Sequence, residues 1–265
     1  MQKRNWIWCL ALMTVTSSVT FADEWHKTFP VSGKPDLRVE VTDGSVSIRS
    51  SETSEIAARV ITHGWKIGDS EVRITEHQNG NRVEIDVRTP RLNVSFGRHS
   101  VELELLVPHE LLAQIHSGDG KISAQDLKGE IHFSSGDGSI EADSIDGVLE
   151  AKTGDGHIRV NGRWDRLDLQ TQDGSVEADA RVGSKMAGSW RVNTGDGHVT
   201  LRLPENFAAD LDVHTGDGKV TIDFPVTMSG SFGGSDVRGK LNGGGQMLVV
   251  RTGDGPIRLQ RLRRS

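Results

Sequence analysis

Cysteine is almost absent from this 265-residue chain, and the single copy, Cys9, lies close to the N-terminus. A chain with one cysteine cannot form an internal disulfide, and a structural metal site built from several thiolates is excluded as well. Stability must therefore come from buried apolar side chains and backbone pairing, which a chain of this length can supply.

The sequence also has no apolar run long enough to span a membrane. Its N-terminus instead has the parts of a secretory signal. These are the charged pair Lys3 and Arg4, the apolar stretch Trp6 to Val15, and the small-residue cleavage site Thr20-Phe21-Ala22. The alternative is a short membrane anchor, but a spanning helix needs roughly 20 apolar residues. We predict a cleaved signal peptide over residues 1–22 and export to the periplasm or cell surface, with no transmembrane segment left.

An excess of basic charge is missing too. Without Lys3 and Arg4 the chain keeps 29 basic against 37 acidic residues, a net charge of −8. Electrostatic attraction to nucleic acid is therefore not expected.

Local catalytic signatures are equally absent. The sequence contains no Gly-x-Ser-x-Gly elbow, no phosphate-binding loop and no His-Glu-x-x-His pattern. The enzymatic alternative is a polysaccharide-active β-helix, which sets acids and bases on one sheet face. The residues nearest to such a group are Glu150, Asp168, Arg191 and Asp212. We expect no catalytic residues, no enzymatic activity and no cofactor.

Glycine is abundant, with 31 copies, and many belong to an internal repeat. A Ser/Thr-Gly-Asp-Gly-x-Ile/Val motif recurs, with Gln172 in place of one first glycine. Its aspartates are Asp119, Asp137, Asp155, Asp173, Asp196, Asp217 and Asp254. Its glycines are Gly118, Gly120, Gly136, Gly138, Gly154, Gly156, Gly174, Gly195, Gly197, Gly216, Gly218, Gly253 and Gly255. The first four aspartates are 18 residues apart, which indicates a coil of about that length with later insertions.

Apolar and polar residues alternate on both sides of each motif. One apolar column contains Ile122, Ile140, Ile158 and Val176, and the residues next to them are polar. Such alternation is typical of half-buried strands, and units this short bury their apolar face only by stacking. The pattern predicts an all-β fold, a single-stranded parallel β-helix (β-solenoid), forming one domain over residues 23–265 with regular coils over 109–262.

Two segments depart from the 18-residue period. Residues 51–108 contain longer alternating strands and a hairpin turn at Asn79-Gly80-Asn81, so we expect an antiparallel β segment that covers the N-terminal end of the stack. The glycine-rich insertion Ser229 to Gly245 is predicted to be a flexible loop. No segment has a helical pattern.

The motif itself is interpreted as a tight turn. Glycine adopts positive φ without strain, and an aspartate side chain can bond nearby backbone N–H groups. On this interpretation Gly156 has positive φ and resists a β-branched substitution. The flanking Ser and Thr hydroxyls are expected to form a ladder between coils.

The turn aspartates have a second interpretation, as a ladder of Ca²⁺ sites over Asp119, Asp137, Asp155, Asp173, Asp196 and Asp217. We favour turn closure, because one carboxylate per coil rarely completes the 6 to 8 oxygen ligands of Ca²⁺. A similar choice applies to His116, His157, His198 and His214 beside the turns. We favour a solvated face over a metal-binding or pH-sensing cluster for these four residues.

The serial Ser/Thr-Gly-Asp-Gly turns, the export signal and the entry segment Phe29 to Val41 resemble the bacterial putative-adhesin domains of unknown function. The resemblance covers residues 28–262 and implies a β-helix, but it specifies no ligand. We expect an exported, non-enzymatic binding or adhesion scaffold of the cell envelope, with a surface protein or polysaccharide as partner. The other alternative is a Ca²⁺-stabilised structural protein of the envelope.

Overall fold

The protein is described by a computed structural model over residues 22–68, 70–90, 99–228 and 234–262. In these residues all regular secondary structure is β, which confirms the predicted all-β class. No helix suited to crossing a membrane occurs among them. The predicted signal peptide lies outside the described residues, apart from Ala22, which opens the first strand.

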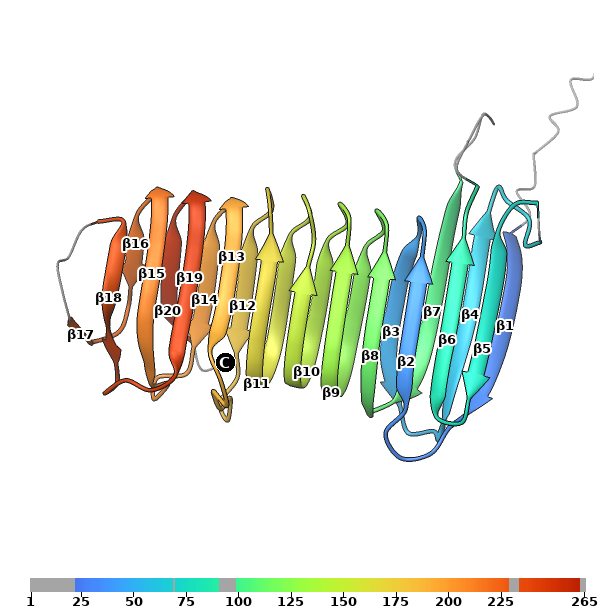
Figure 1. Ribbon diagram of the computed structural model, residues 1–265, viewed down its shortest axis with the longest axis horizontal. Coiled ribbons are helices and arrows are strands. Elements are labelled where there is room, and N and C mark those ends of the chain that lie inside the picture. The colour runs from blue at the N-terminus through green and yellow to red at the C-terminus, as the bar shows by residue number, and fades with distance from the viewer. Residues whose placement is uncertain (1–21, 69, 91–98, 229–233, 263–265) are drawn as a thin grey trace, which may run out of the picture.

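The strands belong to one continuous sheet that is folded into two facing layers (Figure 1). We call them the front and back sheets. In spatial order the front sheet contains β5 (Arg73–Asn79), β6 (Arg82–Arg88), β2 (Asp36–Val41), β8 (Glu110–Ser117), the second halves of β9 (Ile122–Ser135), β10 (Ile140–Lys152) and β11 (Ile158–Thr171), then β13 (Trp190–Asp196), β19 (Met247–Asp254), β15 (Ala209–Asp217), β18 (Asp236–Leu241) and β17 (Val226–Met228). The back sheet contains β1 (Ala22–Pro30), β4 (Glu55–His63), β7 (Ser100–Pro108), β3 (Ser45–Ser51), the first halves of β9 to β11, then β12 (Val176–Ala180), β14 (Val199–Leu203), β20 (Ile257–Arg261) and β16 (Val220–Ile222).

Each regular coil passes once through both sheets. A Gly-Asp-Gly turn carries the chain from the front sheet to the back sheet, and a bend within β9 or β10 returns it. The bends contain residues with positive φ, namely Asp126 (58°) and Gly129 (136°) in β9, and Ser144 (57°) and Gly147 (109°) in β10. Left-handed backbone at these positions turns the strand through a corner without ending its pairing.

Between the two sheets, apolar side chains stack in columns. Ile140 pairs in parallel register with Ile122 and with Ile158, and Ile158 pairs with Val176. None of the four is more than 1% exposed. The predicted stack of parallel coils is therefore confirmed.

The spatial order of the coils differs from their order along the sequence. β19 pairs with β13 on one side and with β15 on the other, so the last coil in the sequence lies between the two that precede it. The same happens at the N-terminal end, where β2 and β3 lie directly beside β8 and β9. Residues 55–108 are therefore placed outside the first coil, farther along the stack.

The N-terminal end of the stack is closed as the sequence predicted. β4 pairs antiparallel with β1 and β7, and the β5–β6 hairpin turns at Gly80, where φ is +57°. Across this end, Lys27 of β1 forms an ion pair with Glu76 of β5 at 2.5 Å. A charge pair between the edge strands disfavours pairing with another sheet.

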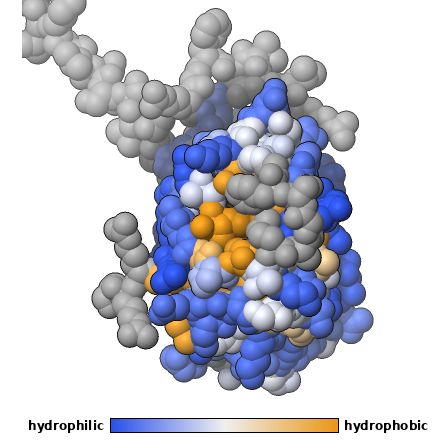
Figure 2. Space-filling model, turned by 90° about the vertical axis from the view of Figure 1, so that its left-hand side faces the viewer, coloured by the Kyte–Doolittle hydropathy of each residue, from blue (hydrophilic) through white to orange (hydrophobic). Residues whose placement is uncertain are grey.

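At the opposite end, the predicted loop over Ser229 to Gly245 is wrong in part. Residues 229–233 lie outside the described residues, but Asp236–Leu241 forms β18, antiparallel to β15 and β17. Val237 and Leu241 are buried. The alternation of apolar and polar residues therefore forms a strand here, although the segment is rich in glycine. Figure 2 views this end and shows hydrophobic residues among polar ones; half-buried Ile222 and Val226 belong to its last strands.

The turn glycines also require a correction. Positive φ was expected for them, yet among all the motif glycines only Gly255 has it, at 134°. What they share is close contact between successive turns, because a Cβ built on any of them would approach a neighbouring backbone carbonyl to less than 3.0 Å. Gly156, for example, lies against the carbonyl of Gly138. Glycine is therefore required for clearance, not for left-handed backbone.

The Ser and Thr hydroxyls of the motif connect successive coils as expected, and they do so through hydrogen bonds to glycine backbone atoms. The Thr153 hydroxyl donates to the Gly138 carbonyl at 2.8 Å, and the Thr194 hydroxyl donates to the Gly174 carbonyl at 2.7 Å. In the other direction, the N–H of Gly174 donates to the hydroxyl of Thr171 in its own turn, at 3.2 Å. Each buried hydroxyl is thus satisfied by backbone atoms, which fixes the spacing of the turns.

This arrangement predicts that Gly156→Ala lowers the free energy of unfolding by about 1–3 kcal/mol, because the added methyl group overlaps the backbone of the preceding turn. Gly188→Ala is the matched control, since a Cβ there has no atom within 4 Å. Urea unfolding of both variants measures the difference. Equal midpoints would show that the turns do not require the clearance.

Candidate functional site: a groove on the front sheet

The outer face of the front sheet carries a polar groove. Because the apolar residues of each strand point into the core, the residues between them line up on this face in rows. A groove of about 770 Å³ lies over β5, β6, β2, β8, β9 and β10. Its polar lining comes from Arg38, Glu40, His77, Glu84, Asp86, Gln114, His116, His132, Ser134, Glu150 and Lys152.

The β9 and β10 side of the groove is a connected set of charges. Lys152 and Glu150 form an ion pair, and His132 lies between Glu150, at 3.1 Å, and Glu130, at 3.3 Å. The hydrogen bond from Lys152 holds the pKa of the Glu150 carboxyl below its usual range, and Glu150 raises the pKa of Lys152. These groups stabilise one another, which suits binding more than proton transfer.

The β2 and β6 side of the groove is different. Glu40 of β2 lies opposite Asp86 of β6, and Arg38 lies two residues before Glu40 on the same face. Asp86 bonds Arg88 through Oδ2 at 2.8 Å, whereas its Oδ1 is buried and has no hydrogen-bond partner. Sequence reasoning missed this side of the groove, because β2 pairs with β6 and β8 only after the N-terminal strands are reordered in space.

The structure does not contain the acid-base group that the sequence analysis considered. Its four residues were Glu150, Asp168, Arg191 and Asp212. Register places Glu150 beside Asp168, and Asp168 beside Arg191, but Asp212 lies beyond β19. Asp168 is bonded to Arg191 at 3.0 Å, and Asp212 to Arg251 at 2.7 Å. With each carboxylate paired to a cation, none is placed as a free general acid or base.

The turn aspartates line one edge of the stack and are exposed. Asp196 and Asp217 each pair in register with Asp254, which was not part of the predicted ladder. Among the described residues no three His, Asp or Glu side chains are grouped as metal ligands. Closure of the turns stays our prediction for this column of aspartates.

The four histidines beside the turns separate into two faces. On the front sheet His116 bonds Ser134 at 2.9 Å, and His214 bonds Asp236 at 2.7 Å. On the back sheet the Ser175 N–H donates to Nδ1 of His157 at 3.1 Å, and the Ser175 hydroxyl contacts Nδ1 of His198 at 2.9 Å. The four do not form one cluster.

Sequence reasoning missed the contact between Ser175 and His198, which lie 23 residues apart on neighbouring coils. A serine bonded to a histidine is the start of a nucleophile-base pair. Here, however, Nε2 of His198 lies 3.9 Å from Glu177, too far for an orienting hydrogen bond. The contact continues the Ser139–His157–Ser175 ladder between coils and has a structural explanation.

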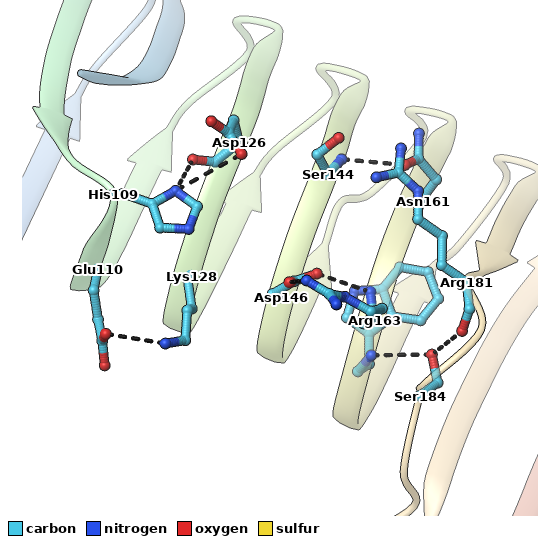
Figure 3. A network of polar contacts seen from close by, with 11 residues as sticks. His109, Glu110, Asp126, Lys128, Ser144, Asp146, Asn161, Arg163, Arg181 and Ser184 are labelled. Carbon is cyan, nitrogen blue, oxygen red and sulfur yellow. Dashed lines mark hydrogen bonds and ion pairs between the residues drawn. The ribbon is translucent and has the colours of Figure 1, made fainter. Parts of the chain in front are cut away.

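A second polar network follows the bends on the other edge of the stack (Figure 3). Lys128 pairs with Glu110 at 3.1 Å, the His109 ring bonds the Asp126 carbonyl at 2.9 Å, and Arg163 pairs with Asp146. Each contact joins neighbouring coils. We interpret this network as support for the bends, because its charged groups are satisfied by one another.

A flattened β-solenoid with close-packed glycine turns, and with polar rows on both outer faces, defines a class of repeat scaffold, and the fold alone specifies no function. The chain belongs to the Toastrack DUF4097 family, a domain of unknown function, whose family model matches residues 114–260. This confirms the resemblance drawn from the turns. No curated protein matches the sequence.

Solved structures of low sequence identity are similar to most of the chain. One is a "putative cell adhesion protein" from Clostridium sporogenes, with 18% identity, coverage of 91% of this chain and 100% of that one, and a TM-score of 0.45. Others are a "putative adhesin" from Parabacteroides merdae and one from Bacteroides fragilis. Both have 9% identity and cover 89% of this chain and 96% of theirs, with TM-scores of 0.41 and 0.35.

The charge network in the groove predicts a low pKa for Glu150, below 4.5, that rises in the Lys152→Met variant. Because folding lowers this pKa, the stabilising contribution of Glu150 is present above about pH 4.5 and is lost as the pH falls through the folded-state value. Carbon-13 NMR titration of the carboxyl group measures both values. An unchanged pKa in Lys152→Met would contradict the assigned cause.

For the turn aspartates we predict that the thermal midpoint of unfolding is the same in millimolar Ca²⁺ as in millimolar Mg²⁺. We also expect Asp155→Asn to be tolerated, since asparagine makes the same local bonds. A ligand bound only by the folded state would raise the midpoint. A Ca²⁺-specific rise of several degrees, lost in Asp155→Asn, would establish the cation ladder instead.

Proposed function

We propose that this chain is an exported, non-enzymatic binding scaffold of the cell envelope, and that the groove on the front sheet holds its partner. The observation that carries the proposal is the groove itself. It is a depression of about 770 Å³ lined by polar side chains from six parallel or antiparallel strands. A rigid stack of coils presents these side chains at fixed spacing, as binding surfaces of repeat proteins do.

Ion pairing supports a binding role over catalysis. The carboxylates that could act as acids or bases on the front sheet, such as Glu150 and Asp168, are engaged by Lys152 and Arg191. The Ser175–His198 contact lies on the other sheet, without a bonded carboxylate to orient the histidine. Paired charges of this kind recognise a ligand through complementarity more readily than they transfer protons.

Export is supported by the N-terminal sequence and by the construction of the fold. The first strand, Ala22–Pro30, starts at the predicted cleavage site, so cleavage after Ala22 removes one residue of β1. The core is built from burial and backbone pairing alone, in keeping with a chain that has no second cysteine. The cell envelope as the place of action is part of the proposal.

The test is retention of the purified mature chain on sedimented cell envelopes from the organism that makes it. Gln114→Trp should abolish retention, because Gln114 is exposed in the groove and a tryptophan there fills it. Gln125→Trp is the matched control, since Gln125 is an exposed strand residue on the back sheet. No retention of the parent chain, or equal retention of the two variants, would refute the proposal.

A further inference from the structure

Every copy of the turn motif contains an Asp-Gly pair, the sequence at which aspartate isomerises most readily. Because glycine has no side chain, its amide nitrogen reaches the aspartate carboxyl carbon with little hindrance. The nitrogen loses its proton and bonds to that carbon, the carboxyl group loses its hydroxyl, and a succinimide ring forms with release of one water. Water then opens the ring at either carbonyl, which gives aspartate again or isoaspartate, whose main chain runs through the side-chain CH₂.

The turns differ in how the glycine amide of this pair is held. The aspartates of the turns are exposed, so burial does not keep water from them. In three turns, however, the N–H of the glycine that follows the aspartate donates to the Ser or Thr hydroxyl of the same turn, at 3.1 to 3.2 Å. The pairs are Gly120 with Ser117, Gly138 with Ser135, and Gly174 with Thr171.

This hydrogen bond opposes formation of the ring. The nitrogen must give up its proton and the peptide plane must rotate toward the carboxyl group, and both changes break the bond to the hydroxyl. The hydroxyls belong to buried residues, with Ser117 fully buried and Thr171 7% exposed. Water therefore does not replace the lost bond, and buried groups without a partner are costly.

One turn of the same type lacks the hydroxyl. Asp43 and Gly44 join β2 to β3, and the register places Val41 of β2 opposite Ser117 of β8. A Cβ built on Gly44 would lie 3.0 Å from Cγ1 of Val41, whereas one built on Gly120 would lie 2.8 Å from the hydroxyl of Ser117. A methyl group thus occupies the place of the hydroxyl, and the Gly44 N–H lacks the protecting bond.

In other respects the turn at Asp43 matches a protected turn closely. Asp43 and Asp173 are both exposed, and both are followed by Gly-Ser-Val. Gly44 and Gly174 are both buried, and a Cβ on either would overlap a neighbouring backbone carbonyl. Exposure, local sequence and close packing are therefore shared by the two turns, and the hydroxyl distinguishes them.

We propose that Asp43 is a site of spontaneous isomerisation to isoaspartate, and that the buried hydroxyl of the motif protects Asp119, Asp137 and Asp173 from the same reaction. The product has one more CH₂ in the main chain between β2 and β3. The Gly44 carbonyl accepts a hydrogen bond from the Ser117 hydroxyl at 2.8 Å, so the added length disturbs a link between two coils.

The experiment follows isoaspartate in the purified chain during incubation at neutral pH, well below the thermal midpoint. Samples are digested, and electron-transfer mass spectrometry distinguishes isoaspartyl from aspartyl peptides, which have the same mass. We expect isoaspartate to accumulate about tenfold faster at Asp43 than at Asp173, the effect on a rate of one hydrogen bond. In urea the two sites should react at similar rates, because they share the sequence Asp-Gly-Ser-Val.

Three variants exchange the hydroxyl between the two turns. Val41→Thr should slow the reaction at Asp43 about tenfold, and Thr171→Val should speed it at Asp173 by a similar factor. Thr171→Ser keeps a hydroxyl and is the matched control, with the parent rate at Asp173. The rate at Asp119 should stay unchanged in all three, which separates a local effect from a loosened fold.

Equal rates at Asp43 and Asp173 in the folded chain would overturn the proposal. So would a difference that persists in urea, because the local sequence would then cause it. A folded chain that forms no isoaspartate at Asp43, while the unfolded chain does, would show that the turn is protected without a hydroxyl. If Thr171→Val does not fold, the parent chain and Val41→Thr still decide the outcome.

Discussion

The contact between successive Gly-Asp-Gly turns is the constraint on which the rest of the structure depends. The turn backbones come so close that a Cβ on any of the motif glycines would overlap a neighbouring carbonyl, although Gln172 takes the place of one first glycine. A buried Ser or Thr hydroxyl donates to a carbonyl of the preceding turn. This contact sets one spacing for all coils. Because strands grow from these turns in parallel register, the spacing also fixes which apolar residues stack in the core and which polar residues form rows outside.

Much of the fold could be predicted from the sequence, because it depends on local patterns. Alternation around each motif identified the core columns, and Ile122 to Val176 stack as expected. The conformation of the turns could not be predicted in the same way. Both positive φ and close backbone contact select glycine, so its presence at Gly156 did not reveal which one applies.

The order of the coils could not be predicted either. Nothing local distinguishes a coil that adds to the end of the stack from one that enters between two others. β19 and β20 pair with β13 and β14 across more than 50 residues. β18 was missed for a related reason, since its short alternation is surrounded by glycine. The groove follows from the same reordering, because β2 brings Arg38 and Glu40 between β6 and β8.

The most direct test of this account is the order of the turns in the assembled stack. Residues 23–265 contain no cysteine, so pairs of cysteines can be introduced at turn positions of that part of the chain without competing thiols. Neighbouring parallel strands bring Cα atoms to about 4.8 Å, within the range of a disulfide, whereas turns two coils apart are about 10 Å from each other. The account predicts that a cysteine at Asp254 forms a disulfide with one at Asp196 or at Asp217, and that cysteines at Asp196 and Asp217 do not pair. Efficient oxidation of the Asp196 and Asp217 pair would show that the coils stack in sequence order and would contradict the account.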